Sequence, residues 1–303
     1  MKPKILITDK INETAIKEAE KFADVTLDFG ASEDEITNEI SDYDALIVRS
    51  GTKVTGKIIA ASDLKVIGRA GVGLDNIDLE SAKEKGIAVV NAPESLTIAV
   101  TELTFGLMIS LMRNIVIGDK SLREKKWDRH KFMGSELYAK TLGIVGFGRI
   151  GREVSDRANA FGMKVLTFDP YVTVEDARES NAVLVPEISE LLKNSDIVSV
   201  HAPLTPKTKH LINSEKLKLM KNSAVLINIS RGGLVDTKAL IDALKAGEIA
   251  GAALDVFETE PLGESPLLEM DNVVLTPHIG ASSAEAQVIA GTIVVEKIRG
   301  ILG

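Results

Sequence analysis

Three side chains with complementary chemistry follow predicted strands toward the C-terminal end of the sequence. Arg231 comes after the apolar run "INIS", Glu260 after "GAALDVF", and His278 after "NVVLTP". The unperturbed pKa of an imidazole is about 6.5, so it can take up or release a proton near neutral pH. A guanidinium can hold an anion. If the three strands are neighbours in a parallel sheet, a cation, an acid and a titratable base meet at one rim.

Each of these side chains also has an ordinary structural interpretation. A histidine at a strand end can be a satisfied structural group, Arg231 can hold a loop, and Glu260 can be a solvated turn acid. The two glycines that follow Arg231 favour the close approach of some other group to the backbone there. The structural interpretation is kept for the other histidines, which are His130, His201 and His210.

A glycine motif predicts a nucleotide site. Gly146, Gly148 and Gly151 form a G-x-G-x-x-G between a predicted strand and a predicted helix. In that context the first glycine permits a tight turn, the second lets the backbone approach a pyrophosphate, and the third allows close helix–strand packing. Asp169 ends the next predicted strand. Its separation in sequence from the glycine motif is that expected for an acid that binds a ribose hydroxyl. The motif therefore predicts dinucleotide binding rather than a purely structural turn.

The elements that must position these groups alternate between β-rich runs and helical patterns, which indicates an α/β fold with two doubly wound parallel sheets. In the first third the strands are predicted at "KILITD", "VTLDF", "ALIVRS", "KVIGRA" and "AVVNAP". In the rest they are predicted at "KTLGIVG", "MKVLTFD", "DIVSVHAP", "AVLINIS", "GAALDVF" and "NVVLTPH".

Between the two groups of strands, residues 95–113 form a long apolar segment that suits a buried helix. We expect one domain to comprise residues 1–97 plus 284–303, with the last segment helical, and a Rossmann domain to comprise residues 98–283. Two rims that face each other would form a cleft.

Bulk composition narrows the function classes. Of 303 residues, 44 are acidic and 36 basic, for a net charge of −8, which disfavours nucleic-acid binding. No cysteine is present, which excludes disulfides, thiolate catalysis and cysteine-ligated zinc. The start "MKPKILITDK" has no apolar signal core, and no uncharged run approaches the ~18 residues of a membrane span. We therefore expect a soluble cytoplasmic protein that binds neither nucleic acid nor membrane.

The chain resembles a known family along nearly its whole length. The motifs are "VRSGTKVT", "GRAGVGLDNIDLE", "KFMGSELYAKTLGIVGFGRIGREV", "HAPLTPKTKHLI", "INISRGGLVD", "GAALDVFETEP" and "LTPHIGASSAEAQ". Together they resemble the D-isomer-specific 2-hydroxyacid dehydrogenases, and most closely the members that act on a phosphorylated three-carbon acid. The resemblance implies a Rossmann NAD-binding domain, a flavodoxin-like substrate domain, a small-molecule substrate, NAD as cofactor, no metal, and a homodimer.

The resemblance also implies roles for individual residues. His278 would be the general acid/base, Glu260 its hydrogen-bonded partner, and Arg231 the clamp on the substrate carboxylate and carbonyl. The cofactor residues would be Gly146, Gly148, Arg149, Ile150, Gly151, Asp169, Ala202, Pro203, Ile229, Ser230, Asp255, Gly280 and Ala281. The substrate residues would be Arg49, Ser50, Val72, Gly73 and Arg129, the last reaching across a dimer.

Two other functions fit the same motifs. One is a different dehydrogenase of the family, such as a glyoxylate or hydroxypyruvate reductase, which the sequence separates from a phosphate-specific enzyme only through anion-binding arginines. The other, more remote, is a non-enzymatic corepressor-like protein that senses NAD. A turnover assay with several 2-hydroxy and 2-keto acids would separate the three.

Overall fold

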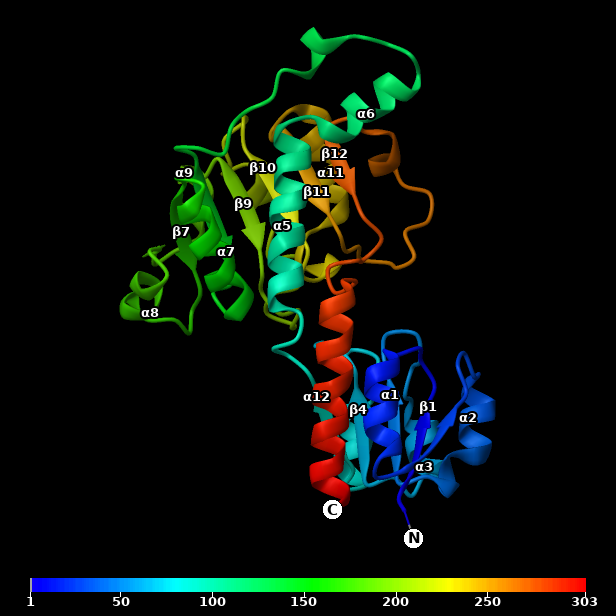
Figure 1. Cartoon of the computed structure of the whole chain (residues 1–303). Helices are drawn as coiled ribbons and strands as arrows, with labels where there is room; N and C mark the ends of the chain where they lie inside the picture. The colour runs from blue at the N-terminus through cyan, green and yellow to red at the C-terminus, as the bar shows by residue number, and fades with distance from the viewer. Residues whose placement is uncertain (1) are drawn as a thin grey trace. The chain divides into compact units, whose positions relative to one another are not determined.

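The computed structural model describes residues 2–303, which divide by their contacts into two compact units (Figure 1). The first unit comprises Met1–Ala99 and Ala281–Gly303, and the second comprises Val100–Gly280. These divisions fall within a few residues of the expected boundaries at 97/98 and 283/284. Each unit is built around its own parallel sheet.

The first unit has a five-stranded parallel sheet in the order β2-β1-β3-β4-β5. Its strands are β1 (Lys4–Ile7), β2 (Asp24–Leu27), β3 (Ala45–Val48), β4 (Val66–Arg69) and β5 (Ala88–Asn91). This is the flavodoxin-like order, in which the order of strand addition reverses between β1 and β3. The predicted fold of this part is confirmed.

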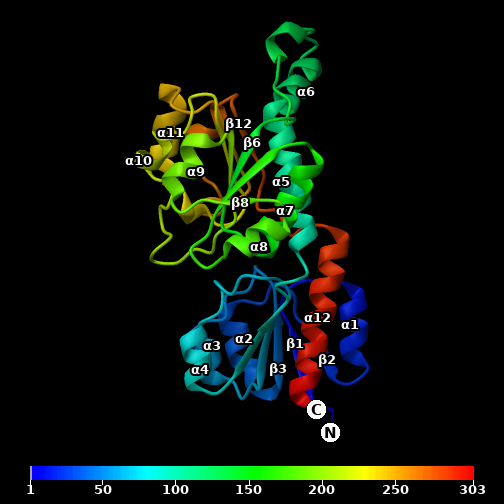
Figure 2. The ribbon, with the colours of Figure 1, turned by 90° about the vertical axis from the view of Figure 1, so that its left-hand side faces the viewer.

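Helices cover both faces of this sheet. They are α1 (Glu13–Glu20), α2 (Glu33–Glu39), α3 (Gly56–Ala61), α4 (Leu79–Glu84) and α12 (Ala284–Leu302), with a 3₁₀ turn at Ile40–Asp42. Alternate strand residues feed two cores: Ile5 and Ile7 point to the side of α1 and α12, and Leu6 to the side of α2 and α3. Figures 1 and 2 both show the C-terminal helix beside α1 and the sheet.

Small residues let α12 pack closely against the sheet and against α1 in the first unit. A Cβ added at Gly68 of β4 would lie 2.5 Å from Val294 Cγ1, and one added at Gly291 would lie 2.6 Å from Ala15 Cβ. Side chains at these two positions would push the helix away. The C-terminal helix is thereby packed onto the sheet and helix formed by the N-terminal residues of the chain.

The second unit has a seven-stranded parallel sheet in the order β12-β11-β10-β9-β6-β7-β8. Its strands are β6 (Thr141–Val145), β7 (Lys164–Phe168), β8 (Val183–Leu184), β9 (Ile197–Val200), β10 (Val225–Asn228), β11 (Gly251–Leu254) and β12 (Val273–Leu275). Counted from β6, this is the Rossmann order 3-2-1-4-5-6 with one further strand, as predicted. The two-residue β8 escaped prediction, because so short a run has no periodicity.

Helices and short turns complete the second unit. They are α5 (Thr97–Met112), α6 (Ile115–Arg123), α7 (Arg149–Ala160), α8 (Val174–Glu179), α9 (Ile188–Asn194), α10 (Ser214–Leu217) and α11 (Thr237–Ala246), with 3₁₀ turns at Arg129–Phe132, Gly232–Leu234 and Pro266–Glu269. The predicted apolar helix is α5, whose Phe105 stacks on Phe161 with ring centroids 5.2 Å apart. Among residues 2–303, no single helix is long and apolar enough to cross a bilayer. Only α5 and α6 taken together, across a bend of 62°, reach that length.

Candidate active site

The strand registers of the second unit bring the candidate residues together at one edge of its sheet, the edge formed by the carboxyl ends of the strands. Phe168 pairs with Val145 and Val145 with Val200, at the carboxyl ends of their strands. The same line continues through Asn228, Leu254 and Leu275 on β10, β11 and β12. The residues that follow these ends are Asp169, Gly146, His201, Ile229, Asp255 and Thr276. Open parallel sheets bind their ligands at this edge.

The three glycines of the loop between β6 and α7 differ in their surroundings. Gly146 has φ +94°, and a Cβ there would lie 2.7 Å from the carbonyl carbon of His201. A Cβ at Gly151 would lie 2.5 Å from Gly146 O, so this glycine allows the helix to pack on the strand. At Gly148 no atom of residues 2–303 lies within 4 Å of an added Cβ. The protein's own packing therefore does not require this glycine.

The start of α7 is suited to phosphate. Its N-cap is Gly148, which offers no side chain to accept the first N–H groups of the helix. These N–H groups and the positive end of the helix dipole attract anions. The open space beside Gly148 and the uncapped helix together fit the pyrophosphate of a dinucleotide.

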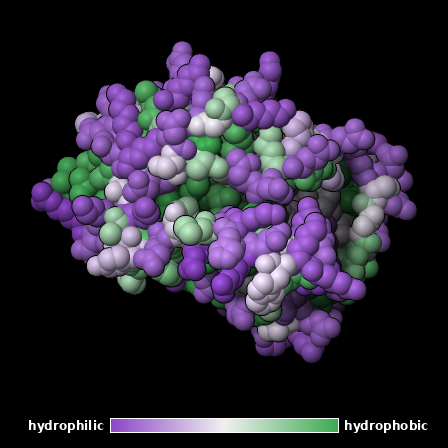
Figure 3. All heavy atoms as spheres, turned by 90° about the horizontal axis from the view of Figure 1, so that it is seen from above, coloured by the Kyte–Doolittle hydropathy of each residue, from purple (hydrophilic) through white to green (hydrophobic). Residues whose placement is uncertain are grey.

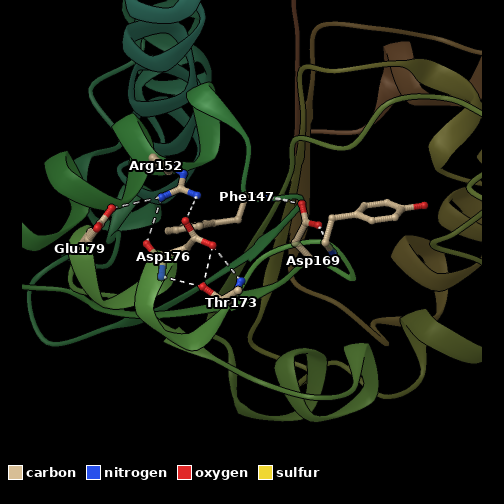
Figure 4. A network of polar contacts seen from close by, with 7 residues as sticks. Phe147, Arg152, Asp169, Thr173, Asp176 and Glu179 are labelled. Carbon is tan, nitrogen blue, oxygen red and sulfur yellow. Dashed lines mark hydrogen bonds and ion pairs between the residues drawn. The ribbon is translucent and has the colours of Figure 1, made fainter.

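Asp169, directly after β7, is held in a fixed orientation (Figure 4). Its Oδ2 accepts a hydrogen bond of 2.8 Å from the Phe147 N–H, and its Oδ1 accepts one of 2.9 Å from the Tyr171 N–H. Each carboxylate oxygen has two lone pairs, so both oxygens can still accept from ribose hydroxyls. The first bond joins the acid directly to the glycine loop.

An arginine beside the same loop is engaged in protein contacts. Arg152 lies 3.0 Å from Asp176 and 3.9 Å from Glu179, and its guanidinium lies 5.6 Å from the centre of the Phe147 ring (Figure 4). Hydrogen bonds from Thr173, followed by the one from Arg152, lower the pKa of Asp176 to about 2. This network fixes the start of α8 against α7.

His278 and Glu260 form a hydrogen-bonded pair. The distance from His278 Nδ1 to Glu260 Oε2 is 2.6 Å, and Glu260 Oε1 accepts from the Phe257 N–H at 2.9 Å. About half of the His278 side chain (49%) is exposed. A carboxylate on one ring nitrogen orients the imidazole and leaves Nε2 for a proton transfer.

Asp255 builds the turn that carries His278. This fully buried acid accepts from Thr276 Oγ1 at 2.6 Å and from the Ile279 N–H at 2.8 Å on Oδ1, and from the Gly280 N–H at 2.8 Å on Oδ2. Three of its roughly four acceptor positions are thus occupied. The cofactor contact that the resemblance implies for Asp255 would use the remaining one.

The loop after β10 is organised by a buried asparagine. Asn228 is 1% exposed; its Nδ2 donates to Arg231 O at 3.0 Å, and its Oδ1 accepts from the Ser230 N–H at 3.2 Å. Ser230 Oγ donates to Ala202 O at 2.7 Å, which links this loop to the "HAP" segment with Pro203. Ile229 is buried between these contacts. Sequence reasoning missed Asn228, although a polar residue inside a buried apolar run is a usable signal.

The candidate substrate residues of the first unit end strands β3 and β4. Asp9 Oδ2 accepts from the Arg49 N–H at 2.6 Å, and the neighbouring Ser50 is exposed. Asn76 Nδ2 donates to Arg49 O at 2.7 Å, while Asn76 Oδ1 accepts from Arg69 Nε at 3.0 Å. Arg69 is a second cation at this edge that sequence reasoning did not select.

The loop of Val72 and Gly73 is tied to the helix that ends the chain. Asn91 Nδ2 donates to Val72 O at 2.5 Å, and Lys297 Nζ of α12 donates to Asn91 O at 2.8 Å. Of the candidate cofactor residues, Gly280 lies in the second unit, whereas Ala281 belongs to the first. Arg149 and Ile150 lie in the first turn of α7.

Arg129 lies in a segment rich in exposed apolar side chains. It begins the turn Arg129–Phe132 and lines a small pocket with Leu122, Trp127 and Phe132. The exposed fractions of the apolar side chains in and around this segment range from 47% to 87% for Ile115, Val116, Leu122, Trp127 and Met133. Apolar residues (green) are visible on the face shown in Figure 3.

Comparison with known proteins gives a consistent family. Residues 105–280 match the family model of the D-isomer specific 2-hydroxyacid dehydrogenase, NAD binding domain. A D-3-phosphoglycerate dehydrogenase of Methanocaldococcus jannaschii is 54% identical over 99% of this chain and 57% of its own length. A hydroxypyruvate reductase of Thermotoga maritima is 47% identical over 89% of this chain and 88% of its own length. The chain thus spans little more than half of the first relative and most of the second.

Solved structures agree in fold. The D-lactate dehydrogenase of Aquifex aeolicus, crystallised with NAD and lactic acid, superposes with a TM-score of 0.85 at 32% identity, over 98% of this chain and 94% of its own. An acyclic imino acid reductase in complex with NADPH and D-Arg superposes with a TM-score of 0.85 at 34% identity, over 96% of this chain and 94% of its own.

Proposed function

This chain is a member of the D-isomer-specific 2-hydroxyacid dehydrogenase family, and on that premise we propose that it oxidises D-3-phosphoglycerate to 3-phosphohydroxypyruvate with NAD, a first step of serine biosynthesis. The observation that carries the proposal is the His278–Glu260 pair, 2.6 Å apart, at the sheet edge that also carries the glycine loop. Relatives at 54%, 49% and 46% identity bear this activity in their names.

The chain's own residues fit NAD. Gly146, Gly148 and Gly151 leave room for a pyrophosphate at the start of α7, and Asp169 has acceptor capacity for the ribose hydroxyls. A carboxylate at position 169 repels a 2′-phosphate, so NAD is favoured over NADP. When bound, the nicotinamide supplies the acceptor for a hydride.

Proton removal falls to His278. Glu260 occupies Nδ1, so Nε2 takes the proton from the substrate's C2 hydroxyl while the hydride leaves C2 and the C2–O bond becomes a carbonyl. The Glu260 carboxylate stabilises the imidazolium that results. Arg231 holds the substrate carboxylate with its planar fork, which fixes C2 for transfer.

The phosphate of the substrate needs cations other than Arg231. Arg49, at the end of β3, is the main candidate, and Arg129 is a second that acts across a dimer. Arg69 ends the neighbouring strand and shares Asn76 with the Arg49 loop. These arginines separate a phosphate-specific enzyme from a general 2-hydroxyacid dehydrogenase.

The test is turnover by the purified chain, followed by nicotinamide absorbance. The substrates are D-3-phosphoglycerate, 3-phosphohydroxypyruvate, D-glycerate, hydroxypyruvate and glyoxylate, each with the NAD and NADP forms. We expect the highest kcat/KM for the phosphorylated pair with the NAD form. Equal use of phosphorylated and unphosphorylated acids would reject the proposed substrate, and no turnover at all would favour an NAD-sensing binding protein.

A second candidate is hydroxypyruvate reductase. The observation in its favour is a relative with this activity in its name, the hydroxypyruvate reductase of Thermotoga maritima, which is 47% identical over 89% of this chain. The same site would then run in the direction of reduction, with His278 donating the proton. Higher kcat/KM for hydroxypyruvate than for 3-phosphohydroxypyruvate would establish this alternative.

The proposal includes a homodimer in the cytoplasm. The exposed apolar side chains around Trp127 and Met133 support an interface with a second copy. The absence of cysteine is compatible with a reducing compartment. Light scattering of the purified chain, and fractionation of the cells that produce it, test the two statements.

A further inference from the structure

A second histidine–carboxylate pair has its carboxylate close in sequence to that of the first. His210 Nε2 lies 2.8 Å from Glu258 Oε2, and Glu258 is separated from Glu260 by a single residue. The side chains are 36% and 32% exposed, so both are partly shielded from water. The mechanism proposed above uses neither residue. Their arrangement therefore calls for a separate explanation.

Glu258 is bonded on both of its oxygens. Besides the contact with His210, its Oε1 accepts from the N–H of Thr237, the first residue of α11, at 2.8 Å. Burial by itself would raise the pKa of Glu258, but the hydrogen bonds from Thr237 and His210 outweigh it, and the pKa lies below its usual value. The acid is therefore ionised at neutral pH and receives the His210 Nε2–H as a charge-assisted bond.

The backbone of His210 reaches the other catalytic loop. His210 adopts a left-handed conformation with φ +51°, and its N–H donates to Gly233 O at 2.8 Å. Gly233 is two residues after Arg231. A single residue thus bonds the Arg231 loop through its backbone and the Glu260 segment through its side chain. Left-handed backbone in a residue other than glycine is uncommon and persists only where its surroundings hold it.

The two loops also touch directly. A Cβ added at Gly232 would lie 1.9 Å from Phe257 C and 2.4 Å from Glu258 N, so only glycine permits this approach. The Phe257 N–H in turn donates to Glu260 Oε1 at 2.9 Å. A continuous set of contacts therefore runs from the Arg231 loop to the Glu260 carboxylate, and from Glu260 to the ring of His278.

We infer that the His210–Glu258 bridge is a positioning device that sets Arg231 and Glu260 relative to each other; this inference rests on the proposed function. Neither His210 nor Glu258 touches the reacting atoms. They act by fixing the segment between β11 and Glu260 against the loop after β10. A displacement of about 1 Å at a catalytic group can cost up to about 100-fold in rate, so such a bridge affects kcat.

Substitutions at position 210 separate the side-chain bridge from the backbone. Asparagine tolerates the left-handed backbone but is too short to reach Glu258, whereas glutamine extends an amide N–H to about the reach of Nε2. For His210→Asn we expect kcat to fall about 10-fold or more, with KM for NAD and Kd for NADH within about twofold of wild type. His210→Gln should recover most of the lost kcat. Lys209→Ala, at the exposed neighbouring residue, is the matched control and should behave as wild type.

A double variant tests whether the two residues act together. Glu258→Ala should lower kcat as His210→Asn does, and the combination should be no worse than the poorer single variant, because both remove one bridge. Additive losses would show that the residues act separately. Wild-type kcat in His210→Asn would overturn the inference. So would a parallel loss of kcat, cofactor affinity and melting temperature that His210→Gln does not rescue.

Amide exchange makes the test independent of the substrate assignment. If the wild-type chain turns over no 2-hydroxy acid, the proposed function fails, but the bridge can still be assessed at the Phe257 N–H, which is bonded to Glu260. We expect faster hydrogen exchange at Phe257 in His210→Asn than in wild type or Lys209→Ala. Unchanged exchange would show that the bridge does not hold this segment.

Discussion

The backbone of His278 shows how the surroundings of one residue prepare it for chemistry. Its φ is +52°, an uncommon value for a residue with a side chain, and its N–H donates to Asp255 O at 2.8 Å. The bonds that Asp255 makes to the turn offset the cost of this conformation, which is on the order of 1–3 kcal/mol. This turn places the ring against Glu260.

Replacement of His278 by asparagine should abolish turnover. Asparagine accepts the left-handed backbone but cannot carry the proton, so kcat should fall by a factor of about 10²–10⁴. The substitution leaves every proposed cofactor residue unchanged, so Kd for NADH, measured by fluorescence, should stay within a few-fold. His130→Asn, at an exposed histidine, serves as the control. Near-normal turnover in His278→Asn would remove the acid/base assignment.

Arg49→Ala should act selectively on phosphorylated substrate. The Arg49 backbone is fixed by Asp9 whatever its side chain, so the substitution removes mainly the guanidinium. If a charge-assisted bond worth about 1.5–3 kcal/mol is lost, KM for 3-phosphoglycerate rises about tenfold or more, while KM for D-glycerate changes little.

The control for that substitution is Lys65→Ala. Lys65 directly precedes β4, at the amino ends of the strands of the same sheet, and pairs with Asp44 at 2.9 Å. It should leave both Michaelis constants unchanged. Equal losses for the two substrates in Arg49→Ala would mean that this arginine supports the fold or holds the carboxylate.

At the scale of elements, the β6–α7 loop separates a requirement of folding from one of binding. Ala at position 148 meets no atom of residues 2–303 within 4 Å, so the melting temperature should be retained while Kd for NADH rises about tenfold or more. Ala at position 151 meets Gly146 O at 2.5 Å, which should cost roughly 1–3 kcal/mol and lower the melting temperature by several degrees. Scanning calorimetry and NADH titration of the two variants give the comparison. The same phenotype in both would contradict it.

The end of β9 makes the stability of the second unit depend on pH. Nδ1 of His201 is enclosed without a hydrogen-bond partner among residues 2–303, and burial lowers the pKa of His201 from 6.5 to about 4. The unfolded chain therefore binds this proton more readily than the folded one. The contribution to stability is complete above about pH 6.5 and is lost as the pH falls toward 4; at about 1.4 kcal/mol per pKa unit, it is at most about 3.5 kcal/mol.

Urea unfolding checks this dependence. Between pH 7 and pH 4.5, the free energy of unfolding should fall more in the wild type than in His201→Gln, which carries no titratable group at that position. His130→Gln should follow the wild type, since His130 is exposed. Identical slopes for the wild type and His201→Gln would show that His201 is protonated as easily in the folded state as in the unfolded state.

At the scale of the whole molecule, the sequence predicted what depends on local pattern. Strand periodicity located eleven of the twelve strands found in residues 2–303, and the glycine motif located the start of α7. The sequence could not predict contacts between segments that are distant along the chain, such as the bridge from His210 to Glu258 or the approach of Gly232 to Phe257. These depend on the packing of loops, for which a single sequence has no periodic signal.

The proposed role of Arg129 across a dimer leads to a complementation experiment. If Arg129 serves the site of the partner subunit, a heterodimer of one Arg129→Ala subunit and one His278→Asn subunit contains one intact site, because each subunit supplies what the other lacks. Random re-association of equal amounts gives half heterodimers with one intact site in two, so roughly a quarter of wild-type activity should appear. The assay uses 3-phosphoglycerate well below the wild-type KM, where Arg129→Ala alone is weakly active. If Arg129 acts within its own subunit, mixing restores nothing. Light scattering on each variant confirms that the dimers form, so that a lack of rescue counts against the cross-subunit role.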